Sequence, residues 1–377
     1  MGFTMGLNLL LLIAMVATNI LSLYHLSSNL QSKPTSHAPV QQPVPDHLIN
    51  QLRTIRATIF HLTRIQDANA KPSSTSKPAI PSDLLLYSKL APIASSCHNH
   101  PDLLHQYMNY TPFSLCPVDD ELAEALILRG CHPLPRRRCF AATPQKTTTS
   151  YPLHPFPALL PDQAVVWSKY ACKSFACLNR DNKFKGFNTS TVSKPTFLSS
   201  ASDLDITIPE FLKLAKTLSS PIRLGLDVGG GTGAFAARMK LRNVTVLTTT
   251  MNLGAPYNEV VALRGLVPLH VPLQQRLPVF DGVLDFVRLG HAVNRWIPLV
   301  AMEFLVFDVD RVLRGGGLLW IDHFFSKGED LEKVYAPLIG KLGYKRVKWA
   351  IGKKMDGSGV KNGEVYLTAL LQKPVSK

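Results

Sequence analysis

A glycine-rich turn constrains the fold of this 377-residue chain more than any other feature. An apolar run ending in Asp227 leads into Gly229, Gly230, Gly231 and Gly233, and a helix-forming segment follows at once. Glycines allow a tight turn and a close approach of a ligand to the backbone, and a helix N-terminus presents free N–H groups. The sequence therefore predicts a strand, a turn and a helix that bind a nucleotide-like cofactor.

Two motifs fit this turn. Gly229-x-Gly231-x-x-Ala234 fits the loose dinucleotide fingerprint, in which a pyrophosphate lies on the helix N-terminus. Asp227-x-Gly229-x-Gly231-x-Gly233 better fits the pattern of class I S-adenosylmethionine (SAM) methyltransferases, in which the acidic residue faces a cationic aminoacyl sulfonium. The glycines alone leave both cofactors open.

The pattern after Pro195 alternates between strands and helices, which is typical of an α/β, doubly wound Rossmann-like sheet. The expected strands are 223–227, 244–249, 267–271, 284–289, 318–322, 345–351 and 365–372. The expected helices are 210–218, 258–264, 299–313 and 330–342. A loop between the last two strands permits a C-terminal antiparallel hairpin. Such a hairpin is characteristic of a methyltransferase sheet and is not expected of a dinucleotide domain.

Several blocks carry a resemblance to known families. LDVGGGTG, LPVFDGVLDFV and DRVLRGGGLLWID resemble the motifs of class I SAM-dependent methyltransferases. The upstream blocks CHPLPRRRCF and WSKYACKSFACL resemble a group of plant Golgi methyltransferase-like proteins that includes the pectin methyltransferase-like, QUASIMODO-type proteins. The resemblance implies SAM as cofactor, a SAM-dependent methyltransferase activity, a Golgi lumen location and a cell-wall polysaccharide acceptor.

The cofactor-binding residues expected from this resemblance are Asp227, Gly229, Gly231, Gly233, Thr250, Asn252, Gln274 and Gln275. Family members usually carry an acidic residue for the ribose after the second strand, whereas this chain has Thr249, Thr250 and Asn252 there, which would bind a ribose more weakly. Gln274 or Gln275 is expected to meet the adenine edge. The missing carboxylate leaves open a non-catalytic partner or scaffold with this fold, and an NAD(P)-dependent oxidoreductase is the weaker alternative.

Three residues are candidates for catalysis. Methyl transfer is a direct displacement, so the protein mainly aligns the acceptor and excludes water. An ionised carboxylate acceptor needs no general base, whereas a hydroxyl acceptor needs one within hydrogen-bond reach. His291, Asp322 and His323 follow the fourth and fifth strands, at the carboxyl ends where such sheets bind ligands. An ordinary polar loop residue is the alternative for each.

The chain is strongly basic, with a net charge of +15, which favours an anionic partner such as an acidic polysaccharide. No basic run is longer than 136–138, and no nucleic-acid-binding signature accompanies it, so no nucleic-acid partner is expected. Arg288 and Arg295 could pair with an acidic sugar or with a local carboxylate such as Asp285.

All six cysteines lie in a predicted subdomain, 83–195, that precedes the predicted methyltransferase domain, 196–377; they are Cys97, Cys116, Cys131, Cys139, Cys172 and Cys177. Their even number predicts disulfides, with the pairing left open. Free buried cysteines and a zinc site using His98, His100 or His132 are the alternatives, and no metal is expected because no C-x-x-C pair occurs.

The N-terminal segment 1–24 is predicted to be a membrane anchor, because residues 3–24 carry no charged side chain. A signal peptide cleaved near Ala17 is the alternative. Residues 25–82 form a predicted stem with a short amphipathic helix, through which homo- or hetero-oligomers could form. By the positive-inside rule, Lys33 favours a cytosolic location for the chain after the anchor. The cysteines and sequons favour a luminal location, and we give them more weight. We therefore expect a single-pass type II Golgi membrane protein with a luminal catalytic domain.

The glycosylation sequons that support this location begin at Asn109, Asn188 and Asn243. Asn243 lies so close to an expected strand that its modification is in doubt.

Overall fold

The computed structural model describes residues 93, 95–144, 154–157, 159–180, 184, 186–187, 197–290, 292–355, 359 and 363–375. The predicted anchor and stem, 1–24 and 25–82, lie outside these residues. None of the helices in the described ranges is both long enough and apolar enough to span a bilayer. The chain divides into two compact units, Met1–Ser88 and Lys89–Lys377, and the following description concerns the second.

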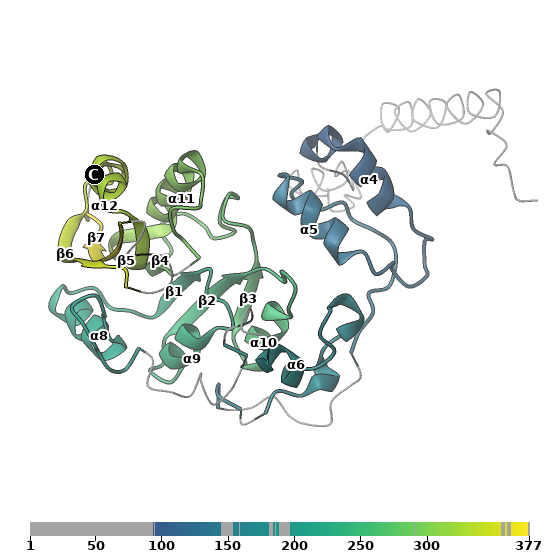
Figure 1. Cartoon of the computed structure of the whole chain (residues 1–377), viewed down its shortest axis with the longest axis horizontal. Coiled ribbons are helices and arrows are strands. Elements are labelled where there is room, and N and C mark those ends of the chain that lie inside the picture. The colour runs from purple at the N-terminus through teal and green to yellow at the C-terminus, as the bar shows by residue number, and fades with distance from the viewer. Residues whose placement is uncertain are drawn as a thin grey trace, which may run out of the picture. The chain divides into compact units, whose positions relative to one another are not determined.

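A seven-stranded sheet forms the centre of this unit, in the order β3-β2-β1-β4-β5-β7-β6 (Figure 1). Its strands are β1 Leu224–Val228, β2 Thr245–Thr250, β3 Val267–His270, β4 Leu284–Leu289, β5 Leu313–Lys327, β6 Lys345–Lys353 and β7 Glu364–Gln372. The first five strands pair in parallel, and β7 runs antiparallel to both β5 and β6. The predicted doubly wound sheet with a C-terminal antiparallel hairpin is confirmed.

β5 is much longer than the expected strand 318–322. It pairs with β4 through Ile321 and continues beside β7 to Lys327. The register with β7 shifts between Ile321 and Phe324, where His323 has a left-handed φ of 52°. The strand is therefore bulged where Asp322 and His323 lie, and a bulge re-aims the side chains on either side of it.

Helices cover both faces of the sheet because successive residues of its central strands point to opposite faces. Phe286 and Trp320 pack with residues of α8 Ile208–Thr217 and α9 Ala234–Lys240, whereas Val287 and Leu319 pack with α11 Leu299–Val312. α10 Tyr257–Leu263 connects β2 to β3.

The expected helix 330–342 is divided into α12 Gly328–Asp330, a π-helical turn Leu331–Tyr335 and α13 Ala336–Gly340. Pro337 lies in the first turn of α13. Because proline lacks the N–H that would continue the preceding hydrogen-bond pattern, a single regular helix cannot run through this position.

The cysteine-rich segment contains α4 Pro101–Met108, α5 Asp120–Leu128 and α6 Phe175–Arg180, with 3₁₀ turns at Ser95–Asn99, Asp162–Ala164 and Trp167–Lys169. Its three disulfides are Cys97–Cys131, Cys116–Cys139 and Cys172–Cys177. The predicted disulfides are confirmed, and the free-cysteine and zinc alternatives are wrong because no thiol is left to serve them.

Buried residues of the cysteine-rich segment pack into two separate hydrophobic clusters. One packs α4 and α5 together around Cys97 and Cys131. The other joins the segment that contains α6 to Ala255 and Val260 of the sheet domain. Of the sequons, Asn109 and Asn243 are exposed, with Asn243 in a left-handed turn just before β2, and Asn188 lies outside the described residues.

Candidate functional site

A cavity of about 720 Å³ opens at the carboxyl ends of β1 to β4. The residues that line it are Leu128, Gly229, Gly231, Thr249, Thr250, Met251, Leu253, Tyr257, Val271, Pro272, Leu273, Gln274, Ala292, Trp296, Ile297, Pro298 and Ala301. Its place follows from the parallel sheet, since ligands of such sheets bind in the crevice beyond the strand ends. The volume is within the range of small-molecule and cofactor sites.

The glycine turn forms the floor of this cavity. Gly229 and Gly231 have positive φ angles of 68° and 56°, which glycine adopts without strain. A Cβ on Gly231 would meet no atom within 4 Å, so this backbone faces open space. The Gly229 N–H donates to Thr249 Oγ1 at 2.9 Å, and the Gly230 N–H donates to the Thr249 carbonyl at 3.1 Å. The turn is thus fixed to the end of β2 and leaves room above Gly231 for a ligand.

Gly233 has a different role in the structure. It begins α9 with a φ of 76°, and a Cβ there would lie 3.1 Å from Leu266 and 3.2 Å from Val261. The residue does not line the cavity. It allows α9 to pack closely on the chain near β3.

The end of β2 brings polar groups to the cavity but no carboxylate. Thr250 lines the wall, whereas the Asn252 side chain is held outside it. Asn252 Nδ2 donates to Glu259 Oε2 at 2.8 Å, and Asn252 Oδ1 accepts from the backbone N–H of Asn258 at 2.9 Å. Thr249 also lines the cavity, but its hydroxyl already accepts from the Gly229 N–H, so Thr250 is the expected residue whose hydroxyl is better placed to meet a ribose.

The two candidate adenine-binding glutamines separate. Gln274 lines the cavity, and its Nε2 donates to the Leu128 carbonyl at 3.2 Å. Gln275 instead lines a neighbouring hollow of about 390 Å³, and both of its amide atoms are buried without a partner among the described residues. The structure thus selects Gln274 as the residue able to meet a ligand in the main cavity.

Asp227 lies beneath the glycine turn and does not line the cavity. Its Oδ1 accepts a hydrogen bond from Arg288 NH1 at 2.6 Å, and the same guanidinium donates through Nε to Asp322 Oδ2 at 3.0 Å. Asp227 and Arg288 are register partners on β1 and β4. All three side chains are at most 5% exposed, so a single guanidinium pairs with two carboxylates inside the sheet domain. Asp227 therefore has an arginine partner within the protein and does not reach the cavity itself.

Comparison with known proteins identifies the family of the chain. It is 62% identical, over 388 aligned residues that cover all of both proteins, to a probable methyltransferase of Arabidopsis thaliana. The chain belongs to this methyltransferase family. No family model matches the chain. Membership bears out the predicted enzyme class, a methyltransferase.

Solved methyltransferase structures are more distant. A SAM-dependent methyltransferase from Methanosarcina mazei is 13% identical, covers 41% of this chain and 94% of its own, and has a TM-score of 0.31. An N-methyltransferase from Bradyrhizobium japonicum is 12% identical, with coverages of 44% and 93% and a TM-score of 0.31. A geranyl diphosphate methyltransferase is 11% identical, with coverages of 44% and 77% and a TM-score of 0.32. The family assignment rests on the Arabidopsis relative and not on these structures.

The residues present fit SAM at the glycine turn. Gly231 offers an unobstructed backbone, Thr250 a hydroxyl at the end of β2, and Gln274 an amide in the loop after β3. The remaining lining is largely apolar, which suits the flat ring of a nucleobase.

Asp322 and His323, the two catalytic candidates among the described residues, contact each other but do not line the cavity. His323 Nδ1 is 2.7 Å from Asp322 Oδ1. This hydrogen bond raises the pKa of His323 above its usual value. Burial would raise the pKa of Asp322, but Arg288 and His323 together hold it well below the usual range. Asp322 is therefore a poor proton acceptor, and His323 is the better one. The third candidate, His291, lies outside the described residues.

Each of the two arginines pairs with a local carboxylate, one of the two alternatives expected, although that carboxylate is not Asp285. Neither Arg288 nor Arg295 pairs with Asp285; Arg295 Nε donates to Glu364 Oε1 at 2.9 Å. Asp285 instead accepts from Arg314 Nε at 2.6 Å and caps two backbone N–H groups at the start of β1. Both arginines thus already have carboxylate partners within the protein.

Two cavity residues of interest were not expected from the sequence. Trp296 is 73% exposed and follows β4 by a few residues, so an aromatic residue after a strand end was a usable signal. Leu128 comes from α5 of the cysteine-rich segment, and nothing in its local sequence indicates that it reaches the sheet.

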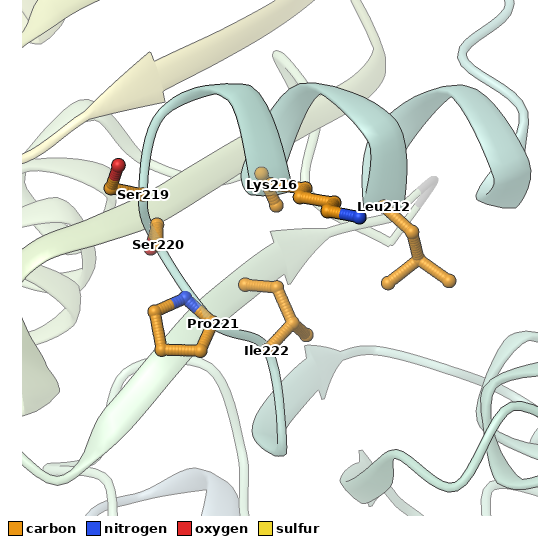
Figure 2. A pocket seen from close by; sticks show the side chains of 7 residues that line it. Leu212, Lys216, Ser219, Ser220, Pro221 and Ile222 are labelled. Atoms are coloured by element: carbon orange, nitrogen blue, oxygen red, sulfur yellow. The ribbon is translucent and has the colours of Figure 1, made fainter.

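A smaller hollow of about 290 Å³ lies between the end of α8 and the start of β1 (Figure 2). Lys216, Ser219 and Pro221 are among its lining residues, all from the stretch 212–222. It is at the amino end of β1, opposite to the edge where ligands of parallel sheets bind. This hollow is therefore not the cofactor site.

Proposed function

We propose that this chain transfers a methyl group from SAM, bound at the carboxyl ends of β1 to β4, to an oxygen of a cell-wall polysaccharide in the Golgi lumen. Two findings support methyl transfer as the reaction: the similarity to a methyltransferase over the full length of the chain, and the open glycine turn at the floor of a cofactor-sized cavity. When bound, SAM supplies an electrophilic methyl group. The chain's own residues bind it, orient the acceptor and exclude water.

The binding residues in this proposal are those that line the cavity. The Gly229 and Gly231 backbones form the floor, Thr250 hydrogen-bonds the ribose and Gln274 meets the edge of the base. Asp227 acts indirectly, because its ion pair with Arg288 joins β1 to β4 directly beneath the turn. Trp296, exposed at the rim, offers a flat face against which an acceptor ring can pack.

The proposed acceptor is a carboxyl or hydroxyl oxygen of an acidic or neutral glycan. The resemblance to plant Golgi proteins motivates this class, and the net charge of +15 favours an acidic polymer. A carboxylate acceptor needs no base. A hydroxyl acceptor needs a base within hydrogen-bond reach; His323, whose ring is held by Asp322, can serve only an acceptor that extends beyond the cavity, because His323 does not line it.

The proposed location rests on the disulfides. Three disulfides persist in an oxidising compartment and not in a reducing one. The exposed Asn109 sequon and the apolar N-terminal segment agree with a luminal domain on a type II anchor. Protease protection of membrane vesicles, combined with an endoglycosidase shift that is smaller in Asn109→Gln, tests this orientation. Digestion of the cysteine-rich segment in sealed vesicles would contradict it.

Calorimetry of the full-length protein in detergent tests the cofactor. We expect binding of SAM and S-adenosylhomocysteine, and no binding of NADPH. No binding of either SAM compound would leave a non-catalytic partner with this fold, whereas NADPH binding would favour an oxidoreductase. The antiparallel β7 already argues against the latter, since dinucleotide-binding sheets are mostly parallel.

The acceptor can be tested with methyl-labelled SAM and two polymers, a de-esterified polygalacturonate and a neutral xylan. Label that mild alkali releases is a methyl ester on a carboxylate, and label that resists alkali is a methyl ether on a hydroxyl. Absence of label on both polymers, with SAM binding intact, would reject the polysaccharide acceptor while leaving the cofactor site in place.

A further inference from the structure

Helix α5 of the cysteine-rich segment contacts the cavity with one face. Leu128, its last residue, lines the cavity, and the Leu128 carbonyl accepts from Gln274 Nε2 at 3.2 Å. One turn earlier, Glu124 Oε1 lies 2.7 Å from His270 Nε2 at the end of β3. Residues four apart share a helix face, so Glu124 and Leu128 both point toward the β3 edge of the sheet.

The Glu124–His270 contact has a defined direction. His270 Nδ1 is 2.7 Å from Asn258 Nδ2, which can only donate. His270 Nδ1 therefore accepts, and Nε2 carries the proton that is donated to Glu124. The other oxygen of Glu124, Oε2, is buried without a partner in the described part of the chain. A carboxylate that is 15% exposed thus depends on this histidine for its hydrogen bond.

The contact belongs to a longer chain of hydrogen bonds. Asn258 Nδ2 also donates to Asn252 Oδ1 at 3.0 Å, Asn252 donates to Glu259, and Glu259 accepts from Tyr170 OH at 3.1 Å. Tyr170 and Glu124 both lie in the cysteine-rich segment. The chain of bonds therefore begins and ends in that segment and passes the ends of β2 and β3, where the cavity wall is formed.

We propose that α5 forms one wall of the cofactor site, at the end where the nucleoside binds. The Leu128 carbonyl orients the Gln274 amide toward the base, and the Glu124–His270 hydrogen bond holds α5 in place. The inference rests on the proposed SAM site for its ligand. One N–H of Gln274 is occupied by Leu128, which leaves Oε1 and the second N–H for the base edge. An adenine amino group can donate to that oxygen, whereas the 6-oxo group of hypoxanthine cannot.

Helix α5 is itself attached by a disulfide. Cys131, three residues after Leu128, is bonded to Cys97, and its N–H donates to the Leu126 carbonyl at 3.0 Å. The cysteine-rich segment thus supplies a cofactor-site wall and is more than a spacer between the sheet domain and the N-terminal part of the chain.

Calorimetry of full-length variants with S-adenosylhomocysteine tests the proposal. Glu124→Ala removes the acceptor for His270 and should weaken binding about tenfold, the scale of one charge-assisted hydrogen bond. Glu124→Gln retains an acceptor oxygen and should restore most of the affinity. Glu121→Ala is the matched control, because Glu121 is exposed on the same helix. It should bind as the unaltered protein does.

Base discrimination separates a positioning role from a merely structural one. The ratio of affinities for S-adenosylhomocysteine and S-inosylhomocysteine should fall in both Glu124→Ala and Gln274→Leu. Unchanged affinity and unchanged discrimination in Glu124→Ala would overturn the proposal. Equal losses in Glu124→Gln and Glu124→Ala would also overturn it, because the acceptor oxygen would then be irrelevant.

Amide hydrogen exchange distinguishes this failure from failure of the SAM site. In the absence of ligand, Glu124→Ala should speed exchange at 126–128 and 271–275 relative to Glu121→Ala. If the unaltered protein binds no S-adenosylhomocysteine, the proposed function and this ligand are both rejected. Faster exchange in Glu124→Ala would then still support the contact of α5 with the sheet, but nothing more. If exchange is unchanged, the docking itself is wrong whatever the protein binds.

Discussion

Removal of Arg288 is the most demanding test of the buried charge network. Its guanidinium pairs with Asp227 and Asp322, and no side chain of the three is more than 5% exposed. Arg288→Met keeps much of the apolar stem but leaves two carboxylates in the interior without their cation. Removing one partner from a buried ion pair typically costs about 3–5 kcal/mol. We expect a loss at the upper end of this range, because two carboxylates lose their partner together.

The assay is urea unfolding at pH 7, followed by tryptophan fluorescence. Trp320, whose ring is 5.7 Å from the Arg288 guanidinium, reports on this part of the core. Arg276→Met is the control, since Arg276 is 72% exposed and lies 3.6 Å from a similarly exposed Asp281. A pair of that kind contributes about 0–1 kcal/mol.

A rescue experiment tests the cause of the loss. If unpaired buried charge is responsible, Asp227→Asn and Asp322→Asn in the Arg288→Met background should recover part of the unfolding free energy. The reasoning would be refuted by equal losses in Arg288→Met and Arg276→Met. It would also be refuted if neutralising the two carboxylates gave no recovery, because the loss would then come from packing against the surrounding aromatic rings.

Three further outcomes are expected. Gly231→Val should abolish S-adenosylhomocysteine binding in calorimetry, because the side chain fills the open floor of the cavity. Gly343→Val is the control, since Gly343 has a similarly positive φ of 66° and equally open surroundings; both variants should lose about 1–2 kcal/mol of stability, but Gly343→Val should not affect binding. The hydrogen bond to Asp322 raises the pKa of His323, so protonation of His323 stabilises the fold. This stabilisation is complete below about pH 6.5 and is lost as the pH rises through the pKa of the folded state. His323→Gln should flatten that part of a curve of unfolding free energy against pH, and an unchanged slope would contradict the pairing. Thr207→Ala should lower the unfolding free energy by about 1 kcal/mol, because Thr207 caps α8 through a capping box. Thr217→Ala, on the exposed end of the same helix, is the control. Equal losses in the two variants would show that the cap is unimportant.

The sheet was predictable because buried parallel strands form short apolar runs with clear boundaries. β4 was predicted at 284–289, which is its extent in the structure, and β1 and β2 are displaced by one residue. β5 was underestimated at both ends: its first residues include the glycines 315–317, which were expected to form a turn, and its last residues pair only with β7, beyond a bulge at His323. A single sequence carries no signal for such a tertiary pairing.

Four residues predicted to bind the cofactor lie at a strand end or within a few residues of it, and the cavity forms there. Gly229, Gly231, Thr250 and Gln274 line the cavity as expected. Asp227 was expected to face the ligand, but its register partner on β4 is an arginine, and a cross-strand neighbour cannot be read from spacing along the chain.

Long-range contacts set the remaining limit. Leu128 meets Gln274 across 146 positions of sequence, so no local pattern on α5 could indicate its place at the cavity. Asn252 was a plausible ribose ligand by position, yet Glu259 and Asn258 occupy its amide in the folded chain.

The interior position of β7 has a consequence for biosynthesis. β7 ends at residue 372 of 377, yet it lies between β5 and β6 and completes the sheet. Until this stretch has been translated, β5 presents an unpaired edge of backbone donors and acceptors, which is the kind of edge that recruits other chains. The domain can complete its fold only after β7 has been synthesised. A premature stop codon shortly before 364 would therefore remove an inner strand and leave an aggregation-prone product, although all of the residues that line the cavity would be present.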